Sequence, residues 1–539
     1  MKQLIIFILL ASFLSGCSDF LEPKAKSEFV PKDASSMNEL LLGEAYPRYD
    51  RAELNLFLGL LDDDVDGAPY QKPATGVNPS LWTAVFSWQP EMYDQMNKAN
   101  GSNYSTYKRY YELILGANAV LDYIQDINDD DVNMVNYVTA QALTLRAFYY
   151  LTLVNIFGAP YNQDKTAMGV PLKLNSGVEQ KDLARNSVEE VYAQIIKDLD
   201  EAGRLYHLLP EDQQWDANYR TSLPMVHLLL SRAYLYMEEW NKAAIYADSV
   251  MTNKNFQLLD LNTVADANNM GMPVYMDHHA YRTSPETIFP YSNISDCVGW
   301  LYNARNQDGE HSYFRASKTL LNTFDEKDLR KNRYISRSWY IAPGETESMY
   351  QAFGKVAMSE DRYYQPLTNG TLMFGRSLRL SEAYLNYCEA KAMLAKQGEA
   401  AAQGEAIRAL EKLRVKRFAP EDYQATNISG TEELINFIRD ERRRELCFED
   451  HRFFDVRRWK LFGDAANFNR TAEAGLPRYR QLGTIYGVAV RENTAVKYNY
   501  GPNPKFPNVT FHAPKNYFVP VPLTEIRKTG YTQTPGWEM

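Results

Sequence analysis

Apolar side chains recur at helical spacing along most of the chain. In residues 137–157, YVTAQALTLRAFYYLTLVNIF, nearly every position of the helical cycle is apolar. This pattern predicts a helix that is buried on most of its sides. Gly158-Ala159-Pro160 follows directly, and glycine and proline at this point predict the end of the helix.

Other helical segments come in pairs. Residues 226–250 read as two helices joined by a tight turn near Glu238–Asn241. Residues 376–396 predict a helix that ends near Gly398, and residues 404–417 supply its partner. Four residues of the first pair fall where a tetratricopeptide repeat places its packing side chains: Leu230, Tyr234, Ala243 and Ala247. We therefore predict a mostly α fold built as a scaffold of tetratricopeptide-like helical hairpins.

Two stretches depart from this pattern. Residues 251–375 and 464–539 are rich in Asn, Pro and Tyr, and their helical periodicity is weaker. Such composition indicates loops and short strands. Loops carry binding side chains more often than the scaffold that supports them, so we expect these loop-rich, short-strand insertions to carry the ligand site.

The composition narrows the range of partners. Of the 539 residues, 45% are apolar and 23% are charged, which is ordinary for a globular protein. The net charge is −10, so no basic excess is available to displace counterions from a nucleic acid. We therefore expect no nucleic-acid partner.

The N-terminus reads as an export signal. Lys2 is followed by a mostly apolar stretch, Leu4–Leu14, which is too short to span a membrane. Leu14-Ser15-Gly16-Cys17 then looks like a bacterial lipobox, which implies cleavage before Cys17 and lipid attached to it. Acyl chains on Cys17 would anchor the protein to a membrane without crossing it. The alternative is a plain signal peptide with a cysteine there by chance.

The other cysteines suggest no chemistry of their own. Cys297, Cys388 and Cys447 are widely spaced, contain no CxxC motif and suggest no disulfide framework. Cys388 and Cys447 lie in helical patterns, so we expect them to be small core residues.

Residues 441–459, ERRRELCFEDHRFFDVRRW, pose a choice between an active site and a scaffold. Paired carboxylates beside a histidine are what general acid–base catalysis uses, and a surface hydrolase would use Glu445, Glu449 and His451. If one helix extends from Leu434 through this stretch, however, its apolar residues share one face with Arg442 and Glu449. Buried charges need partners, so we favour an ion-pair network that locks the helix to its neighbours.

An acidic stretch raises the question of a metal. Asp62, Asp64, Asp66 and Gly67 match the start of a calcium loop, but Pro73 stands where the bidentate glutamate should be. A looser calcium site and a plain acidic loop remain as alternatives.

His278-His279 has no third ligand at a metal spacing, and the sequence thus predicts no metal there. We expect no other cofactor.

Short motifs follow one another from residue 17 to residue 537. In chain order they are Cys17-Ser18-Asp19-Phe20-Leu21-Glu22-Pro23, LRAFYY at 145–150, FGAP at 157–160, RLSEAYL at 379–385, the stretch 441–459, FVPVP at 518–522 and TPGW at 534–537. This ordered set resembles the SusD/RagB family of nutrient-binding lipoproteins. The stretch 441–459 matches the family's fold signature almost letter for letter.

The resemblance implies an outer-membrane lipoprotein, displayed at the cell surface, with four tetratricopeptide-like hairpins. It implies a SusC-like TonB-dependent β-barrel transporter as partner, on which the lipoprotein acts as a lid that captures oligosaccharides. Some members capture peptides, and a peptide ligand therefore stays open, as does a structural partner with no ligand. Members of the family are not enzymes, so the resemblance implies no catalytic residue.

The same reading divides the chain into five parts. These are a signal peptide (1–16), a lipidated tether (17–27), an N-terminal SusD-like helical region (28–270), a loop-rich insertion (271–375) and a C-terminal SusD/RagB-type region (376–539).

Aromatic residues are the candidates for the ligand site. Sugars present C–H faces that pack on flat rings, while their hydroxyls need polar partners. The resemblance implies a glycan platform built from aromatics of the early segment and the mid-chain loops. It also implies that the acidic stretch lies near the ligand face, where Asp64 and Asp66 would accept sugar hydroxyls. We expect six residues to contact glycan: Trp82, Trp300, Tyr302, Asp66, Asn303 and Arg305. Trp339 is a further aromatic in a polar loop, whereas Trp240 and Trp459 are expected to pack in the scaffold.

Overall fold

The fold was analysed in a computed structural model of the chain. The structure describes residues 31–47, 54–55, 57–67, 85, 92–94, 105–178, 183–215, 220–264, 284–291, 314–337, 350–351, 376–460, 495–498, 509–512, 519, 522 and 526.

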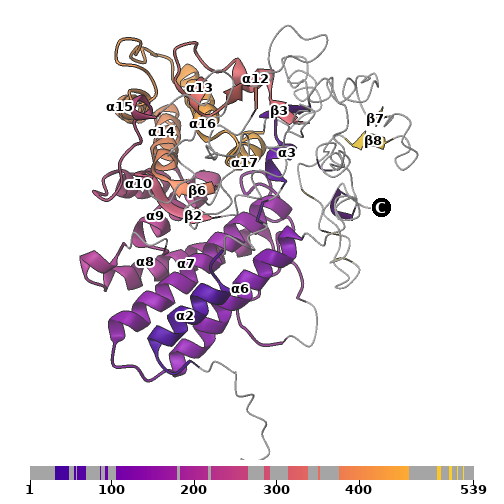
Figure 1. Cartoon of the computed structure of the whole chain (residues 1–539), viewed down its shortest axis with the longest axis vertical. Helices are drawn as coiled ribbons and strands as arrows, with labels where there is room; N and C mark the ends of the chain where they lie inside the picture. The colour runs from indigo at the N-terminus through magenta and orange to yellow at the C-terminus, as the bar shows by residue number, and fades with distance from the viewer. Residues whose placement is uncertain are drawn as a thin grey trace, which may run out of the picture.

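Four helices form the lower half of the molecule in Figure 1. They are α2 (Ala34–Glu44), α6 (Thr106–Tyr123), α7 (Val132–Phe157) and α8 (Val188–His207). Side-chain caps start all four, and Ser187 forms a full capping box with Glu190 at the start of α8. The short 3₁₀ helix η2 (Ile124–Asp126) links α6 to α7.

The predicted buried helix is α7. Its residues from Ala140 to Phe157 are all buried, and it ends at Gly158 as predicted. Arg457 of a distant helix donates to the carbonyl oxygens of Asn155 and Gly158 at this end. A cation at the C-terminus of a helix satisfies carbonyls that have no partner within the helix.

The predicted helical hairpins are confirmed. Residues 226–250 divide into α9 (Leu223–Tyr236) and α10 (Trp240–Met251), and Glu238 between them has a positive φ of 63°. The second pair is α14 (Leu380–Lys396) and α15 (Ala402–Arg414), separated by a turn in which Gly398 has φ 105°. The four expected packing residues, Leu230, Tyr234, Ala243 and Ala247, are all buried.

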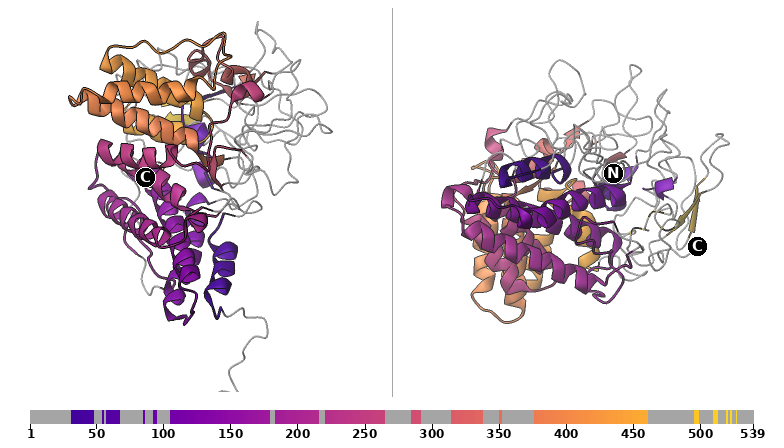
Figure 2. Two further views of the ribbon diagram at one scale, coloured as in Figure 1. Left: turned by 90° about the vertical axis from the view of Figure 1, so that its left-hand side faces the viewer. Right: turned by 90° about the horizontal axis from the view of Figure 1, so that it is seen from below.

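These helices pack as a stack. Contacts run from α6 to α7, then through α8, α9 and α10 to α14, which packs on both α15 and α16 (Thr431–Leu446). Figures 1 and 2 show α9 and α10 between the lower helices and the upper group. One continuous apolar core runs through the stack. The mostly α, tetratricopeptide-like prediction is therefore confirmed.

Two helix predictions were wrong in extent. Residues 376–379 are not the first turn of a helix but the strand β6 (Arg376–Arg379), whose four residues are all buried. The stretch after Leu434 is not one helix, because α16 ends at Leu446 and α17 (His451–Arg458) follows a sharp turn. Phe448 and Asp450 have positive φ values of 63° and 69° in this turn, which no α-helix accommodates.

The strands of the described residues pair in antiparallel twos. They are β1 (Val65–Gly67) with β3 (Phe314–Ala316), β2 (Thr287–Tyr291) with β6, β4 (Ser336–Arg337) with β5 (Tyr350–Gln351), and β7 (Ala495–Tyr498) with β8 (Val509–His512). Short helices accompany them: α3 (Leu58–Leu61), η3 (Glu211–Gln213), η4 (Leu261–Thr263), α12 (Lys318–Leu321) and α13 (Arg330–Arg333).

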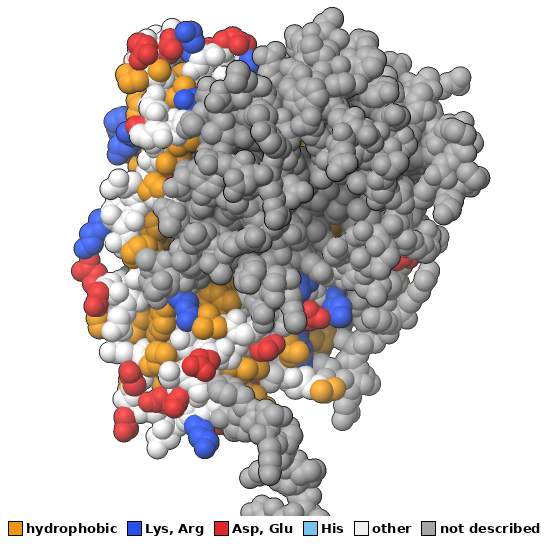
Figure 3. Space-filling model, in the orientation of Figure 1, with side chains coloured by type: hydrophobic (Ala, Val, Ile, Leu, Met, Phe, Trp, Pro, Cys, Tyr) orange, Lys and Arg blue, Asp and Glu red, His pale blue; other side chains and the backbone are white. Residues whose placement is uncertain are grey.

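The described surface carries mixed charge. In Figure 3, acidic and basic side chains are interspersed with apolar ones over the visible described helices. Within the described part of the chain, no helix combines the length and the apolar character that a membrane crossing requires.

Candidate functional site

Glu445 of α16 lies at the centre of a buried ion-pair cluster. Its side chain is 0% exposed. Three arginines from separate elements contact its carboxylate: Arg330 of α13 at 3.1 Å, Arg379 of β6 at 2.8 Å and Arg417, which follows α15, at 2.8 Å. The hydroxyl of Tyr334 donates to the same carboxylate at 3.1 Å. The cluster therefore fixes α13, β6 and the end of α15 against α16.

A second carboxylate extends the cluster to the strand β2. Glu286, directly before β2, accepts from Nη1 of Arg379 and from Nη2 of Arg417, each at 2.9 Å. The hydroxyl of Ser381 also donates to Glu286. Arg379 in addition forks onto Glu449, with Nε at 2.9 Å and Nη2 at 3.0 Å from its two oxygens. Forked pairs of this kind fix direction as well as distance.

The helix α17 is held in the same way. Arg458 donates to both oxygens of Glu389 on α14 at 2.6 Å, and Trp459 Nε1 donates to Glu389 at 2.7 Å. Arg442 of α16 donates to Asp455 of α17 at 2.8 Å. These bonds join the two helices to each other and to the hairpin beneath them.

Three buried carboxylates of this region, those of Glu445, Glu441 and Glu389, have a lowered pKa. Burial would raise the pKa of Glu445, but Arg417 and Arg379 outweigh burial and hold that pKa well below its ordinary value. The same balance between burial and neighbouring arginines lowers the pKa of Glu441 and of Glu389 to about 2. A general acid or base works with a pKa near the working pH, and these groups are far from it.

The stretch 441–459 is thus a scaffold, as predicted. Its hydrolase alternative would need Glu445, Glu449 and His451 to face a cleft, but they are only 0%, 6% and 5% exposed. Glu445 and Glu449 are paired with arginines, and His451 contacts the guanidinium of Arg442 at 3.4 Å.

The turn between α16 and α17 contains a carboxylate whose pKa is raised and not lowered. Asp450 is buried, and burial raises its pKa to about 6 even though Arg376 of β6 lies 2.8 Å away. Phe448 and Asp450 both adopt left-handed backbone in this turn, which is unusual for residues other than glycine.

A further group of ion pairs holds the acidic stretch after α3. Asp62, Asp63 and Asp64 are buried, and Arg452 of α17 forks onto Asp63 at 2.6 and 2.8 Å. Arg443 of α16 donates to Asp64 at 2.8 Å. The expectation that Asp64 accepts sugar hydroxyls was therefore wrong, because its side chain is 1% exposed and already bonded to an arginine.

The calcium alternative involved Asp62, Asp64 and Asp66. Asp62 accepts the backbone N–H of Asp64 at 2.9 Å, and Asp64 pairs with Arg443. The side chain of Asp66 lies outside the described residues. Among the described residues, no three His, Cys, Asp or Glu side chains gather as a metal site would require.

Three of the described strands border, in sequence, the segments that carry the predicted ligand residues. Asp66 of β1 lies opposite Arg315 of β3 in the antiparallel register. The segment with Trp82 follows β1 in sequence, and the segment with Trp300, Tyr302, Asn303 and Arg305 precedes β3. β3 also contacts β5, whose partner β4 leads directly to the segment with Trp339. Trp82, Trp300, Tyr302, Asn303, Arg305 and Trp339 themselves lie outside the described residues.

Other predicted residues can be placed in part. Cys388 and Cys447 are buried in the core, as expected, while Cys17, Cys297 and the His278-His279 pair lie outside the described residues. Trp240 is buried in the scaffold as predicted. Trp459 also belongs to the scaffold, stacked under the guanidinium of Arg458 at 4.7 Å.

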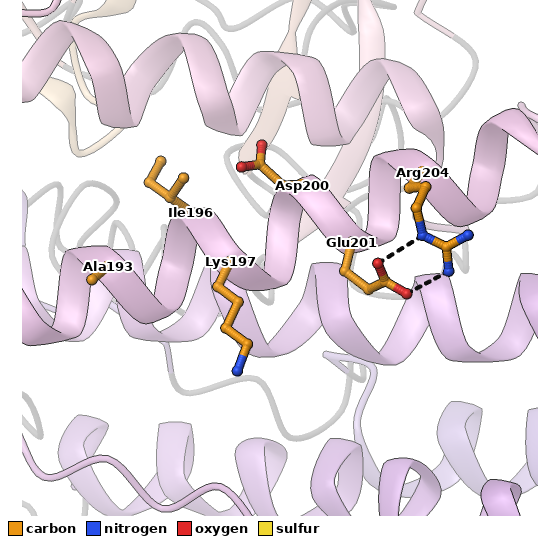
Figure 4. A pocket seen from close by; sticks show the side chains of 6 residues that line it. All are labelled: Ala193, Ile196, Lys197, Asp200, Glu201 and Arg204. Atoms are coloured by element: carbon orange, nitrogen blue, oxygen red, sulfur yellow. Dashed lines mark hydrogen bonds and ion pairs between the residues drawn. The ribbon is translucent and has the colours of Figure 1, made fainter.

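A shallow groove of about 630 Å³ lies along the outer face of α8. Figure 4 shows its lining: Ala193, Ile196, Lys197, Asp200, Glu201 and Arg204. Glu201 and Arg204 pair with each other, and Lys197 points away from Asp200. All six residues belong to one helix, and their polar groups do not converge on a common point.

The sequence reading missed most partners of the cluster. Glu286, Arg330, Arg376 and Arg417 lie in stretches whose periodicity is weak or ends, so no helical face marked them as buried. A usable signal was present only in Arg379-Leu380-Ser381-Glu382, where charges stand directly beside apolar positions.

Comparison with known proteins agrees with this architecture. A model described as "SusD family" matches residues 370–537, and one described as "Starch-binding associating with outer membrane" matches residues 54–235. A SusD-like protein P2 from Formosa agariphila is 24% identical over 455 residues, which are 80% of this chain and 79% of that protein.

Solved structures share the fold. A crystal structure of a SusD superfamily protein from Bacteroides vulgatus has a TM-score of 0.64 and 16% identity, and covers 94% of this chain and 99% of its own. A SusD-like carbohydrate binding protein from the same species has a TM-score of 0.62 and 20% identity, with 93% and 97% covered. The architecture is thus a tetratricopeptide-like helix stack. The chain belongs to the SusD/RagB family.

Proposed function

We propose that this protein is a cell-surface lipoprotein, anchored to the outer membrane through Cys17, that binds oligosaccharide or polysaccharide. It delivers the glycan, as a lid, to a SusC-like TonB-dependent β-barrel transporter. Family membership supports the class of function, because the matching models and relatives are described as starch-binding, carbohydrate binding or SusD-like.

The pairing of β1 with β3 is the observation that carries the proposed binding face. It joins Val65–Gly67 to Phe314–Ala316, which contain Asp66 and border, in sequence, the segments that hold the other residues expected to contact sugar. Pyranose rings pack on aromatic faces, and their hydroxyls bond to carboxylate, amide and guanidinium groups. In the proposed site, Trp82, Trp300 and Tyr302 supply the rings, and Asp66, Asn303 and Arg305 supply the polar groups.

Binding without catalysis fits the chemistry of the described carboxylates. Glu445 of α16, Glu449 in the turn after it and Asp455 of α17 are paired with arginines inside the scaffold. In the proposed function the protein holds its glycan intact and releases it into the barrel.

A ligand screen tests the proposal. Soluble protein that lacks residues 1–17 is titrated by calorimetry with starch, other polysaccharides, host glycans and peptides. Heat with one class of glycan supports the proposal, and Trp300→Ala is then expected to weaken binding about tenfold or more, with an unchanged melting temperature. Heat of binding with peptides alone would mean that the cargo is a peptide and not a glycan. Wild-type affinity in Trp300→Ala would remove that residue from the site.

A further inference from the structure

Three consecutive carboxylates after α3 are buried, and their removal from water costs free energy. Asp62, Asp63 and Asp64 are each less than 5% exposed, and burial raises the pKa of Asp64 in spite of the neighbouring Arg443. Removing a carboxylate from water costs several kcal/mol, and apolar residues of similar volume often give equal or greater stability. Stability alone therefore does not explain the arrangement. A forked guanidinium–carboxylate pair adds fixed direction, which apolar contacts do not.

Two arginines hold this turn from a distant part of the chain. Arg452 forks onto Asp63 with Nε at 2.6 Å and Nη2 at 2.8 Å. Arg443 donates through Nε to Asp64 at 2.8 Å and through Nη2 to the carbonyl of Asp63 at 2.9 Å. Both carboxylates thus have their direction set by α16 and α17.

The same arginine also reaches the second chain segment. Nη2 of Arg443 donates to the hydroxyl of Thr319 on α12 at 3.1 Å. Ser317 closes the junction, because its N–H donates to the carbonyl of Asp64 at 2.8 Å and its hydroxyl to the carbonyl of Asp63 at 2.7 Å. One guanidinium therefore bridges the corner before β1 and the corner after β3.

The clamped residues adjoin the two strands directly. Asp64 is followed by Val65, the first residue of β1, and Ser317 follows Ala316, the last residue of β3. Val65 and Ala316 face each other in the register. The proposed ligand segments adjoin the other end of the pair in sequence, after Gly67 and before Phe314, so a displacement of the clamp moves the two strands that lead to them.

We propose that Arg443 and Arg452 are positioning residues for glycan binding. They fix β1 against β3 from the helix stack, and so set the position of the two strands that lead to the proposed ligand segments. This inference rests on the proposed function, and its test separates the two.

The test compares Arg452→Gln with a matched control, Arg232→Gln. Arg232 forks onto Glu382 at 2.6 Å through both nitrogens, and its side chain is 10% exposed, as is that of Arg452. The control pair joins α9 to α14, elements that do not include β1 or β3. Both substitutions remove one forked buried pair, and we expect similar losses of melting temperature.

Two measurements distinguish the variants. Amide hydrogen exchange at Val65 and at residues 316–319 is expected to rise about tenfold or more in Arg452→Gln and to stay at the wild-type rate in Arg232→Gln. Native gels that contain soluble starch, laminarin, xylan or alginate then report glycan affinity. In the gel that retards the wild-type protein, Arg452→Gln should lose about tenfold in affinity and Arg232→Gln should retain it.

Each outcome tests either the clamp or the proposed glycan function. Wild-type exchange at both corners in Arg452→Gln would overturn the clamp, and so would faster exchange with undiminished affinity. If Arg452→Gln does not fold, Arg452→Lys, which keeps the charge but not the fork, is compared with Arg232→Lys on the same readouts. A wild-type protein that none of the four gels retards counts against the proposed glycan function, and amide exchange alone then decides the clamp.

Discussion

The charged residues of α16 and α17 behave as core residues. Arg442 is 0% exposed and bonds to Asp455 and Asn386, each at 2.8 Å. A guanidinium in this position is held by direction-specific bonds on several sides. Its removal would leave the buried Asp455 with Arg458 as its remaining arginine and would take the Arg442 donor from Asn386. Removing one partner of a buried ion pair is the costly case.

Arg442→Ala is therefore expected to lower the free energy of unfolding by about 3–5 kcal/mol. Denaturant unfolding of the soluble protein measures the change. Arg204→Ala is the control, because Arg204 pairs with Glu201 on the surface of α8 and should cost less than about 1 kcal/mol. Equal midpoints for wild type and Arg442→Ala would contradict the scaffold role of this residue.

The depressed carboxyl pKa values predict acid sensitivity. Glu441 and Glu389 have a folded pKa of about 2, below the ordinary value they regain on unfolding. Their contribution to stability is complete above about pH 4.5 and is lost as the pH falls toward 2. The melting temperature should fall steeply across this window.

Scanning calorimetry between pH 6 and pH 2 checks this expectation. Glu389→Gln, which removes one of the two charges, should melt lower at neutral pH and show a shallower fall below about pH 4.5. A melting temperature that is flat down to pH 2 would show that these carboxylates are not held in their ionised form.

At the scale of elements, helix contacts depend on small residues at close approaches. A Cβ added at Gly116 of α6 would lie 2.4 Å from the carbonyl oxygen of Glu44, at the end of α2. Since that neighbour is backbone, the contact can be relieved only by moving one helix. Gly43 of α2, by contrast, has open space where a Cβ would be.

Gly116→Ala is expected to destabilise the protein by about 1–3 kcal/mol through this clash. Gly43→Ala, a change of the same chemistry in the neighbouring helix, should instead stabilise by about 0.5–1 kcal/mol, because alanine favours the helix. The two unfolding free energies, measured side by side, report how closely α2 approaches α6. A gain in stability for Gly116→Ala would show that the two helices are not in close contact.

At the scale of elements, the hydrophobic periodicity predicts some features of the fold and misses others. The helices α7, α9 and α10 follow from apolar spacing, because most of their positions face one core. The strand β6 was predicted as part of a helix. Its four residues are all buried, so they do not show the alternation of buried and exposed positions that marks a half-buried strand. The turn at Phe448 and Asp450 was missed because two left-handed residues leave no trace in the hydrophobic pattern. The cluster around Glu445 depends on pairs between distant elements, and no local pattern specifies those pairs.

At the scale of the whole molecule, the helix stack and the β1–β3 pair form over different distances along the sequence. The stack is built from local hairpins, whereas β1 and β3 meet across some 250 residues, as the bond from Ser317 to Asp63 shows. The proposed ligand residues were chosen by their chemistry and by the resemblance to the family, and the strand pairing was not predicted.

Membrane attachment is a property of the entire chain in its cell. Cys17→Ala should move the protein from the membrane fraction to the soluble fraction, because no acyl chain can then be attached. Immunoblots of fractionated cells measure this distribution, and Cys388→Ala serves as a control that removes a buried thiol. A Cys17→Ala protein that stays with the membrane would contradict the lipid anchor.

The long reach of the arginine clamp has a consequence for how the protein matures. Asp63 and its partner Arg452 are 389 positions apart, so an emerging chain cannot neutralise its N-terminal carboxylates until most of its length has been exported. Before then the acidic turn stays hydrated, and the corner that precedes β1 has nothing to dock on. Nascent chains arrested before α16 should consequently be cut by proteases near residue 63, and that cleavage should cease once α17 has left the translocon.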